Sequence, residues 1–237
     1  MHSFSASVHR LPGIAVLLFT LPSLGLGADL KSPDGQVAIA FRTAPLAGHA
    51  SDGGRLVYSV TFRGKPVIME SAISLDLQGQ APLGPDVSIV KSDASIIDET
   101  YRLVTGKASQ VRNRSNALRL DLEERSGSRR SLAIEARAYD DAVAFRYILP
   151  DQAAIRELRL KEEHTEFRLS SDATAYALLL PDTRSMYESA FFRMPFSYLL
   201  QMGHPGSLLV GLPLLLEEPG VAWLAITEAG LEGNSAM

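Results

Sequence analysis

One stretch decides the fold class of this chain: it reads LAIEARAYDDAVAFRYILP and runs from Leu132 to Pro150. Because successive side chains of a strand point to opposite faces, alternation predicts two half-buried strands joined by a tight turn at Asp140-Asp141. A helix would need apolar residues three and four positions apart, and that spacing is missing here. The alternating apolar residues are Leu132, Ile134, Ala136 and Ala138, then Val143, Phe145, Tyr147 and Leu149.

The same alternation recurs along most of the chain. Leu118, Leu120 and Leu122 alternate with charged residues, which predicts a strand with one face in water. Residues 208–216 and 221–226 are continuous apolar runs and are predicted to be strands covered on both faces. Many short strands separated by turn residues predict an all-β fold, a large antiparallel β-sandwich with few or no helices, as one domain over residues 29–237.

Three segments depart from this pattern. Residues 196–202 are compatible with a short helix or a loop. Residues 153–163 carry some helical spacing, but they fit the edge of a sheet almost equally well. Residues 79–110 are rich in Gly, Pro, Ser and Asp and are predicted to form long connections.

Composition limits the classes of function. The chain has 237 residues, of which 46% are hydrophobic, so it can bury a substantial core. Its formal net charge of −4 offers no basic stripe, which argues against a nucleic-acid partner. Because there is no cysteine, the sequence excludes disulfides, thiolate nucleophiles and thiolate metal sites.

Residues 1–28 are predicted to be a secretory signal peptide. His9-Arg10 supply a modest positive start, the apolar run from Gly13 to Leu24 follows, and the small residues Gly25 and Gly27 stand two apart. The apolar run falls short of the roughly 20 residues that a membrane-spanning helix needs. We therefore expect a secreted or periplasmic protein with no membrane span after signal cleavage.

Several short motifs, in order along the chain, resemble the N-terminal domain of glycoside hydrolase family 97. The hairpin at residues 139–150 resembles that family's "F-x-D-G-x-x-F-R-Y-x-x-P" run. Each motif is weak alone, but seven or more in order are specific. The others are Ser32-Pro33-Asp34-Gly35, Tyr58 to Ile68, Asp98-Glu99-Thr100-Tyr101, Val111-Arg112-Asn113, Lys161 to Phe167, Tyr187-Glu188 and Thr227-Glu228-Ala229.

The resemblance implies part of a carbohydrate-active enzyme. In the family, an N-terminal β-supersandwich precedes a catalytic (β/α)₈ barrel that acts on α-glucosides or α-galactosides with bound Ca²⁺. Only the first part resembles this chain, which therefore ends before the barrel in this interpretation. Glycoside hydrolysis needs two carboxyl groups about 5–10 Å apart across the scissile bond. We expect the chain alone to be inactive, because the barrel supplies those groups.

The resemblance also points to three site residues. It places Glu188 as a calcium ligand that reaches across to the barrel in the complete enzyme, and a carboxylate suits a hard cation that takes six to eight oxygens. Tyr187 and Glu228 are candidates for the domain interface or the substrate side. His164 stands among acidic residues and could be a metal ligand, although a lone histidine is more often packed or solvated.

The aromatic residues give little support for an autonomous sugar platform. Trp223 is the only tryptophan and lies in an apolar run, where we expect burial. Phe191, Phe192 and Tyr198 remain candidates for sugar stacking, with core packing as the commoner explanation. Two functions stay open: a sandwich domain that packs on a catalytic barrel and contributes to its calcium and sugar site, or a free-standing carbohydrate-binding or structural sandwich.

Overall fold

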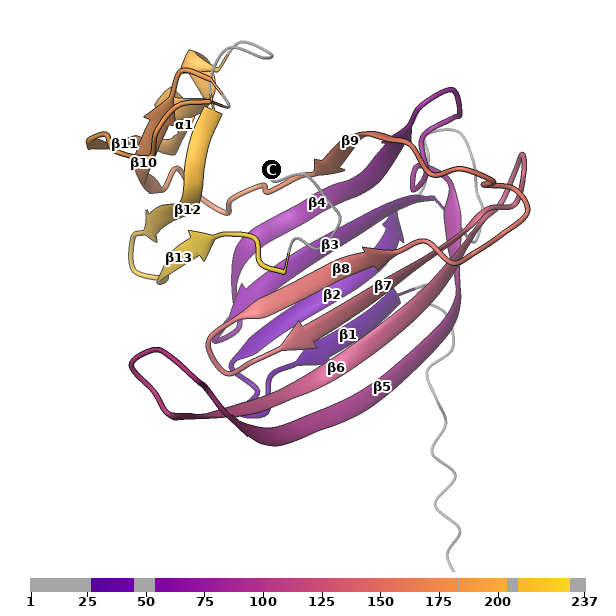
Figure 1. Cartoon of the computed structure of the whole chain (residues 1–237), viewed down its shortest axis with the longest axis horizontal. Helices are drawn as coiled ribbons and strands as arrows, with labels where there is room; N and C mark the ends of the chain where they lie inside the picture. The colour runs from indigo at the N-terminus through magenta and orange to yellow at the C-terminus, as the bar shows by residue number, and fades with distance from the viewer. Residues whose placement is uncertain (1–26, 45–53, 183, 204–208, 231–237) are drawn as a thin grey trace, which may run out of the picture.

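The computed structural model describes residues 27–44, 54–182, 184–203 and 209–230. Thirteen strands and one short helix occupy these residues, in three antiparallel sheets (Figure 1). No helix among the described residues is long and apolar enough to cross a membrane. The expected all-β fold is confirmed. The predicted signal peptide lies outside the described residues except for Gly27 and Ala28, which begin the first strand, so its cleavage stays a prediction.

Two of the sheets pack face to face and form the large sandwich. The first has the strand order β1-β2-β3-β4-β9, and the second has the order β5-β6-β7-β8. The strands of the first sheet are β1 (Gly27–Lys31), β2 (Val37–Ala44), β3 (Arg55–Phe62), β4 (Lys65–Leu77) and β9 (Leu160–Thr165). Those of the second are β5 (Val87–Arg102), β6 (Gln110–Glu124), β7 (Ser131–Ala138) and β8 (Val143–Ile148).

The hairpin predicted from alternation is the pair β7–β8. Its register places Ile134 opposite Tyr147 and Ala136 opposite Phe145. The backbone N–H of Tyr139 donates to the carbonyl oxygen of Ala142 at 2.8 Å, which closes the turn around the two aspartates. The inward residues of this hairpin belong to the main core, so the alternating pattern identified both the strands and their buried face.

Aromatic rings fill the centre of the sandwich. Phe41 of β2 meets Phe145 of β8 edge to face at 5.9 Å, and Tyr58 of β3 lies 5.1 Å from Phe145. The Tyr58 hydroxyl donates to the carbonyl oxygen of Glu166 at 2.7 Å, so its burial leaves no polar atom unpaired. Burial of the ring raises the pKa of Tyr58 far above its usual range, and the hydroxyl stays a neutral donor.

The prediction that residues 79–110 are long connections is wrong. Val87–Arg102 form the longest strand of the sheet, β5, which pairs with β6 along its whole length. From Val90 onward nearly every side chain of β5 is exposed, so neither face selects for apolar residues. Alternation appears only where one face is buried, and this edge strand has no such face. The alternative of a sheet edge is observed for the end of residues 153–163, because β9 begins at Leu160 and no helix forms there.

A third, smaller sheet stands beside the sandwich and has its own core (Figure 1). Its strand order is β11-β10-β12-β13, and its core face is covered by the helix α1 (Phe196–Met202), which confirms the helical alternative for that segment. Leu169 and Leu224 pack against both cores and link them. The strands are β10 (Thr174–Leu180), β11 (Phe191–Pro195), β12 (Leu209–Glu218) and β13 (Ala222–Ile226).

The Asp172 carboxylate accepts hydrogen bonds from the first turn of α1. The backbone N–H of Ser197 donates to the Asp172 carboxylate at 2.8 Å, and the Ser197 hydroxyl donates to its second oxygen at 2.8 Å. These hydrogen bonds lower the pKa of Asp172, because they favour its charged form. Leu199 is the helix residue buried against the sheet.

Candidate functional site

The outer face of the small sheet, turned away from α1, carries exposed aromatic side chains. Tyr176 and Trp223 stack at 5.4 Å with their rings tilted by 35°. The Arg193 Nε donates to the Tyr176 hydroxyl at 3.2 Å, and that hydroxyl points to the Glu217 carboxylate at 3.4 Å. Trp223 is 57% exposed, so the prediction that it is buried is wrong.

The apolar runs of β12 and β13 are covered on one face only, which corrects the expectation of two covered faces. Leu216 and Leu224 are paired and point into the small core, whereas their neighbours Leu215 and Trp223 point outward. Phe191, Phe192 and Tyr198 are also exposed rather than packed in a core. Tyr198 belongs to α1, so Leu215 and Trp223 are the exposed apolar residues of β12 and β13 on the outer face of the sheet.

The loop between β10 and β11 brings Tyr187-Glu188 to this sheet. A side chain at Gly211 of β12 would come within 3.1 Å of the Tyr187 ring and 3.0 Å of Leu178, so the glycine leaves room for both. Tyr187 is nevertheless 62% exposed. Glu188 follows it, exposed, and its carboxylate makes no hydrogen bond or ion pair with another described residue. The predicted loop position of Glu188 is therefore observed, and its role as a metal ligand stays a prediction.

Hydrogen bonds to the Asp182 carboxylate stabilise the start of this loop. The carboxylate accepts hydrogen bonds from the backbone N–H of Arg184 at 2.8 Å and from the Ser185 hydroxyl at 3.0 Å. Aspartate commonly stabilises a turn in this way, by bonding the backbone two residues on. The ordered turn precedes Tyr187 and fixes where the chain turns back toward β11.

Glu228, the third predicted site residue, follows β13 and is half-buried. Its carbonyl oxygen accepts a long hydrogen bond from the Thr227 hydroxyl, at 3.5 Å. Glu228 and Tyr187-Glu188 thus belong to the same small sheet and its loops. A substrate-side role for Glu228 or Tyr187 stays a prediction.

A separate cluster lies on the first sheet of the sandwich, where β4 meets its edge strand β9. The Nε2 of His164 is 3.4 Å from the Asp76 carboxylate and 3.7 Å from that of Glu162. One ligand atom from each residue lies within 4.8 Å of the other two. Asp76 faces Glu162 directly in the ladder, and His164 faces Ser74 two residues along. The sequence pointed to His164 but not to Asp76, because only the strand register brings the two together.

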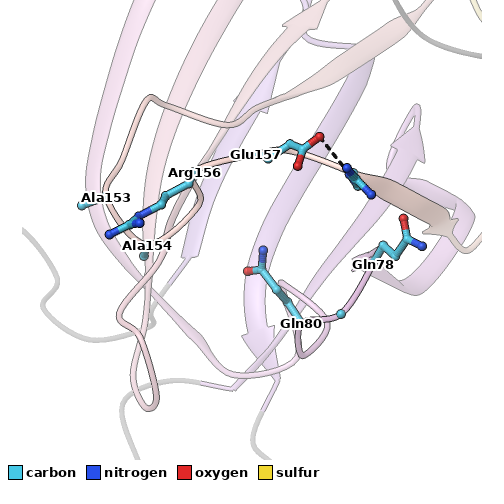
Figure 2. Close-up of a pocket in the computed structure, with 8 residues that line it drawn as sticks. Gln78, Gln80, Ala153, Ala154, Arg156 and Glu157 are labelled. Atoms are coloured by element: carbon cyan, nitrogen blue, oxygen red, sulfur yellow. Dashed lines mark ion pairs between the residues drawn. The ribbon is translucent and has the colours of Figure 1, made fainter.

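A hollow lies at one end of the sandwich (Figure 2). It is open and polar, and its only carboxylate, Glu157, is paired with Arg159 at 2.9 Å. Glycoside hydrolysis would need a second carboxyl group across the substrate, which this hollow does not supply. Its lining comes from the turn after β4 and the segment before β9: Gln78, Gly79, Gln80, Ala153, Ala154, Arg156, Glu157 and Arg159.

The cluster at β4 and β9 does not supply hydrolytic chemistry either. Asp76 and Glu162 are close, but the imidazole of His164 occupies the space between them, where a glycosidic bond would have to lie. Glu163, the other acid of this segment, points to the opposite face and accepts a hydrogen bond from the Thr165 hydroxyl at 2.6 Å. Within the described residues we find no pair of carboxylates arranged around a sugar-sized cleft.

Fold and site together define an all-β domain whose small sheet leaves an apolar face open. The family model described as "Glycosyl-hydrolase 97 N-terminal" matches residues 30–237. The chain therefore belongs to the glycoside hydrolase family 97 N-terminal domain family, as its motifs suggested.

This chain spans about a third of the length of the proteins that it matches. A retaining alpha-galactosidase of Bacteroides thetaiotaomicron is 26% identical over 226 residues, which are 92% of this chain and 31% of the relative. A family 97 enzyme of Pseudoalteromonas sp. strain K8, solved with panose and with acarbose, superposes with a TM-score of 0.72 at 24% identity. A beta-arabinopyranosidase superposes with a TM-score of 0.70 at 23% identity. Both superpositions cover 86% of this chain, but 28% and 31% of the solved chains.

Proposed function

We propose that this chain is the non-catalytic N-terminal part of an exported α-glycoside hydrolase, which packs on a catalytic barrel and supplies Glu188 to its calcium site. The observation that carries the proposal is the family match over residues 30–237, combined with coverage of only 28–31% of the relatives. The substrate class is an α-glucoside or α-galactoside. Export follows from the signal-like residues 1–28 and places the enzyme in the periplasm or outside the cell.

Two features of the small sheet support this role. Glu188 is exposed and has no partner among the described residues, so its carboxylate is available to a cation held mainly by another domain. The outer face places the exposed Trp223 against the Tyr176 ring, and exposed aromatic side chains are common at interaction sites. A barrel docked beside this face would bring its metal site near the Tyr187-Glu188 loop.

The coding sequence after the codon of Met237 provides the first test. The proposal expects an in-frame continuation with alternating strand and helix patterns, because a (β/α)₈ barrel is built from such units. A stop codon at that point would instead support the free-standing sandwich.

The purified 237-residue chain is expected to hydrolyse neither nitrophenyl α-glucoside nor nitrophenyl α-galactoside. The physical reason is that the described residues hold no pair of carboxylates arranged for general acid and nucleophile or base. Release of nitrophenol is the measurement, with an active family 97 enzyme as the positive control. Turnover that survives repeated purification would show that a complete active site exists within these residues.

Substitution of Glu188 tests the calcium role in the enzyme that contains the barrel. Glu188→Gln keeps the size of the side chain and removes the charge that a hard cation needs. We expect calcium affinity and activity to fall by at least about tenfold, as for loss of a metal ligand or its support, with activity partly restored by excess calcium. Calcium-dependent activity assays and calorimetry measure both.

Glu70→Gln is the matched control for that experiment. Glu70 is an exposed glutamate of β4 whose carboxylate makes no ion pair with a described residue. The control should leave calcium dependence and activity unchanged. If Glu188→Gln behaves like Glu70→Gln, then Glu188 is a surface charge and the calcium part of the proposal is wrong.

A free-standing carbohydrate-binding domain is the second candidate, and the exposed Trp223, stacked on the half-buried Tyr176, favours it. Sugar rings stack on exposed aromatic faces, and Glu217 and Arg193 stand beside the pair as hydrogen-bonding groups. Affinity electrophoresis of the chain in gels containing starch or galactan distinguishes the two functions. Retardation that Trp223→Ala abolishes would support this candidate.

A further inference from the structure

We propose that Asp76, Glu162 and His164 form a binding site for a divalent transition-metal ion of the Zn²⁺ class, which clamps the edge strand β9 to β4. This inference is independent of the catalytic barrel and of the calcium role of Glu188. It rests on how the two strands bring the three side chains together.

The positions of the three side chains suit a single metal ion. The three ligand atoms come from different residues on two paired strands and lie within 4.8 Å of one another. The separations of the His164 Nε2 from the two carboxylates, 3.4 and 3.7 Å, are close to those between neighbouring ligands of one metal ion, since each metal–ligand bond is about 2.0–2.2 Å long. Small side-chain movements would therefore complete the coordination without moving the strands.

The charges of the cluster also favour a bound cation. Asp76 and Glu162 are direct partners in the ladder, and like charges in that position destabilise a sheet. His164 is the only basic side chain that reaches them among the described residues, although lysines and arginines pair with carboxylates elsewhere in the sandwich. Two carboxylates thus stand beside a single imidazole. A divalent ion would neutralise both.

The ligand set decides which metal fits. One imidazole and two carboxylates suit Zn²⁺ and similar transition metals, whereas Ca²⁺ and Mg²⁺ prefer oxygen ligands throughout. Three protein ligands leave a coordination position for water. Because β9 has only six residues and lies at the edge of the sheet, a metal bridge to β4 would hold it more firmly in place.

The test is a calorimetric titration of the chelator-treated 237-residue chain with Zn²⁺ alone. We expect saturable binding of one ion per chain, and no comparable heat with Ca²⁺. His164→Ala and Asp76→Asn should each weaken the affinity for Zn²⁺ by at least about tenfold, because each removes one of three protein ligands. Hydrogen exchange of the β9 amides should slow when Zn²⁺ is added to the unmodified chain, but not when it is added to His164→Ala or Asp76→Asn.

Glu163→Gln is the matched control, because Glu163 is the neighbouring carboxylate on the same strand but points to the opposite face. It should leave the affinity for Zn²⁺ unchanged, as should Glu188→Gln, which separates this site from the proposed calcium role. A thermal unfolding scan confirms that each variant is folded. The proposal is overturned if Zn²⁺ does not bind, or if Glu163→Gln weakens binding as much as Asp76→Asn does.

Discussion

Arg130→Ala is expected to lower the free energy of unfolding by about 3–5 kcal/mol, the usual cost of removing one partner of a buried ion pair. Arg130 is only 4% exposed, and its Nε donates to the Glu124 carboxylate at 2.7 Å. It also donates to Gln80 and to the carbonyl oxygen of Pro82, each at 3.3 Å. Without the guanidinium, the Glu124 carboxylate would keep its charge in a site with little water.

The location of the Arg130–Glu124 ion pair explains its large expected contribution to stability. Glu124 ends β6 and Arg130 precedes β7, while Gln80 and Pro82 belong to the turn after β4. The guanidinium therefore joins the two sheets of the sandwich at one end. Urea denaturation followed by far-ultraviolet circular dichroism measures the effect.

Arg129→Ala is the matched control, because the neighbouring arginine is 62% exposed and pairs with Glu123 at the surface. Its removal should change stability by less than about 1 kcal/mol, as is usual for exposed pairs. The double change Arg130→Met with Glu124→Leu should recover most of the loss, since it removes both charges. Equal destabilisation by Arg129→Ala and Arg130→Ala would show that the buried ion pair contributes no more to stability than the exposed pair.

Alternation predicted the sandwich well wherever a strand buries one face. Leu118, Leu120 and Leu122 of β6 are buried, while Arg119 and Asp121 between them are partly exposed. The edge strand β5 was missed because its length comes from hydrogen bonds to β6 rather than from a buried face. Backbone pairing leaves no trace in the side-chain pattern, so a polar edge strand resembles a loop in sequence.

The small sheet shows a second limit of sequence patterns. The run that contains Trp223 is apolar at nearly every position, which suggested two covered faces. In the structure only Leu224 and Ile226 of that strand pack in the small core, while Trp223 is exposed. The same apolar residue types occur on an exposed interaction face and in a buried core. Composition therefore does not distinguish an interaction face from a core.

Only part of the candidate site was predictable from the sequence. The position of Glu188 on an exposed loop followed from turn residues and from the family motifs. The link between His164 and Asp76 did not, because it depends on the register of β4 with β9, two strands far apart in sequence. A one-residue shift of that register would move His164 and Glu162 to the other face. Short-range patterns do not specify such a pairing.

Glu218→Ala is expected to loosen the small sheet and to lower its local stability by about 2–4 kcal/mol, as when a buried hydrogen-bonded group is removed and a cavity remains. Glu218 ends β12 and is 2% exposed. Its carboxylate accepts hydrogen bonds from the Ser170 backbone N–H at 3.1 Å and from the Ser170 hydroxyl at 2.9 Å.

Ser170 lies just after Leu169, the residue that packs against both cores, so these hydrogen bonds hold the connection between the sandwich and the small sheet. Hydrogen exchange should accelerate in β10–β13 and leave the β6–β7 amides unchanged. Glu217→Ala is the control, because its side chain lies on the outer face and contacts Tyr176. Uniformly faster exchange across both cores would contradict a local role. Because the Tyr187-Glu188 loop connects β10 to β11, loosening this sheet would also misplace Glu188, and calcium affinity of the barrel-containing enzyme should fall without any change in a proposed ligand.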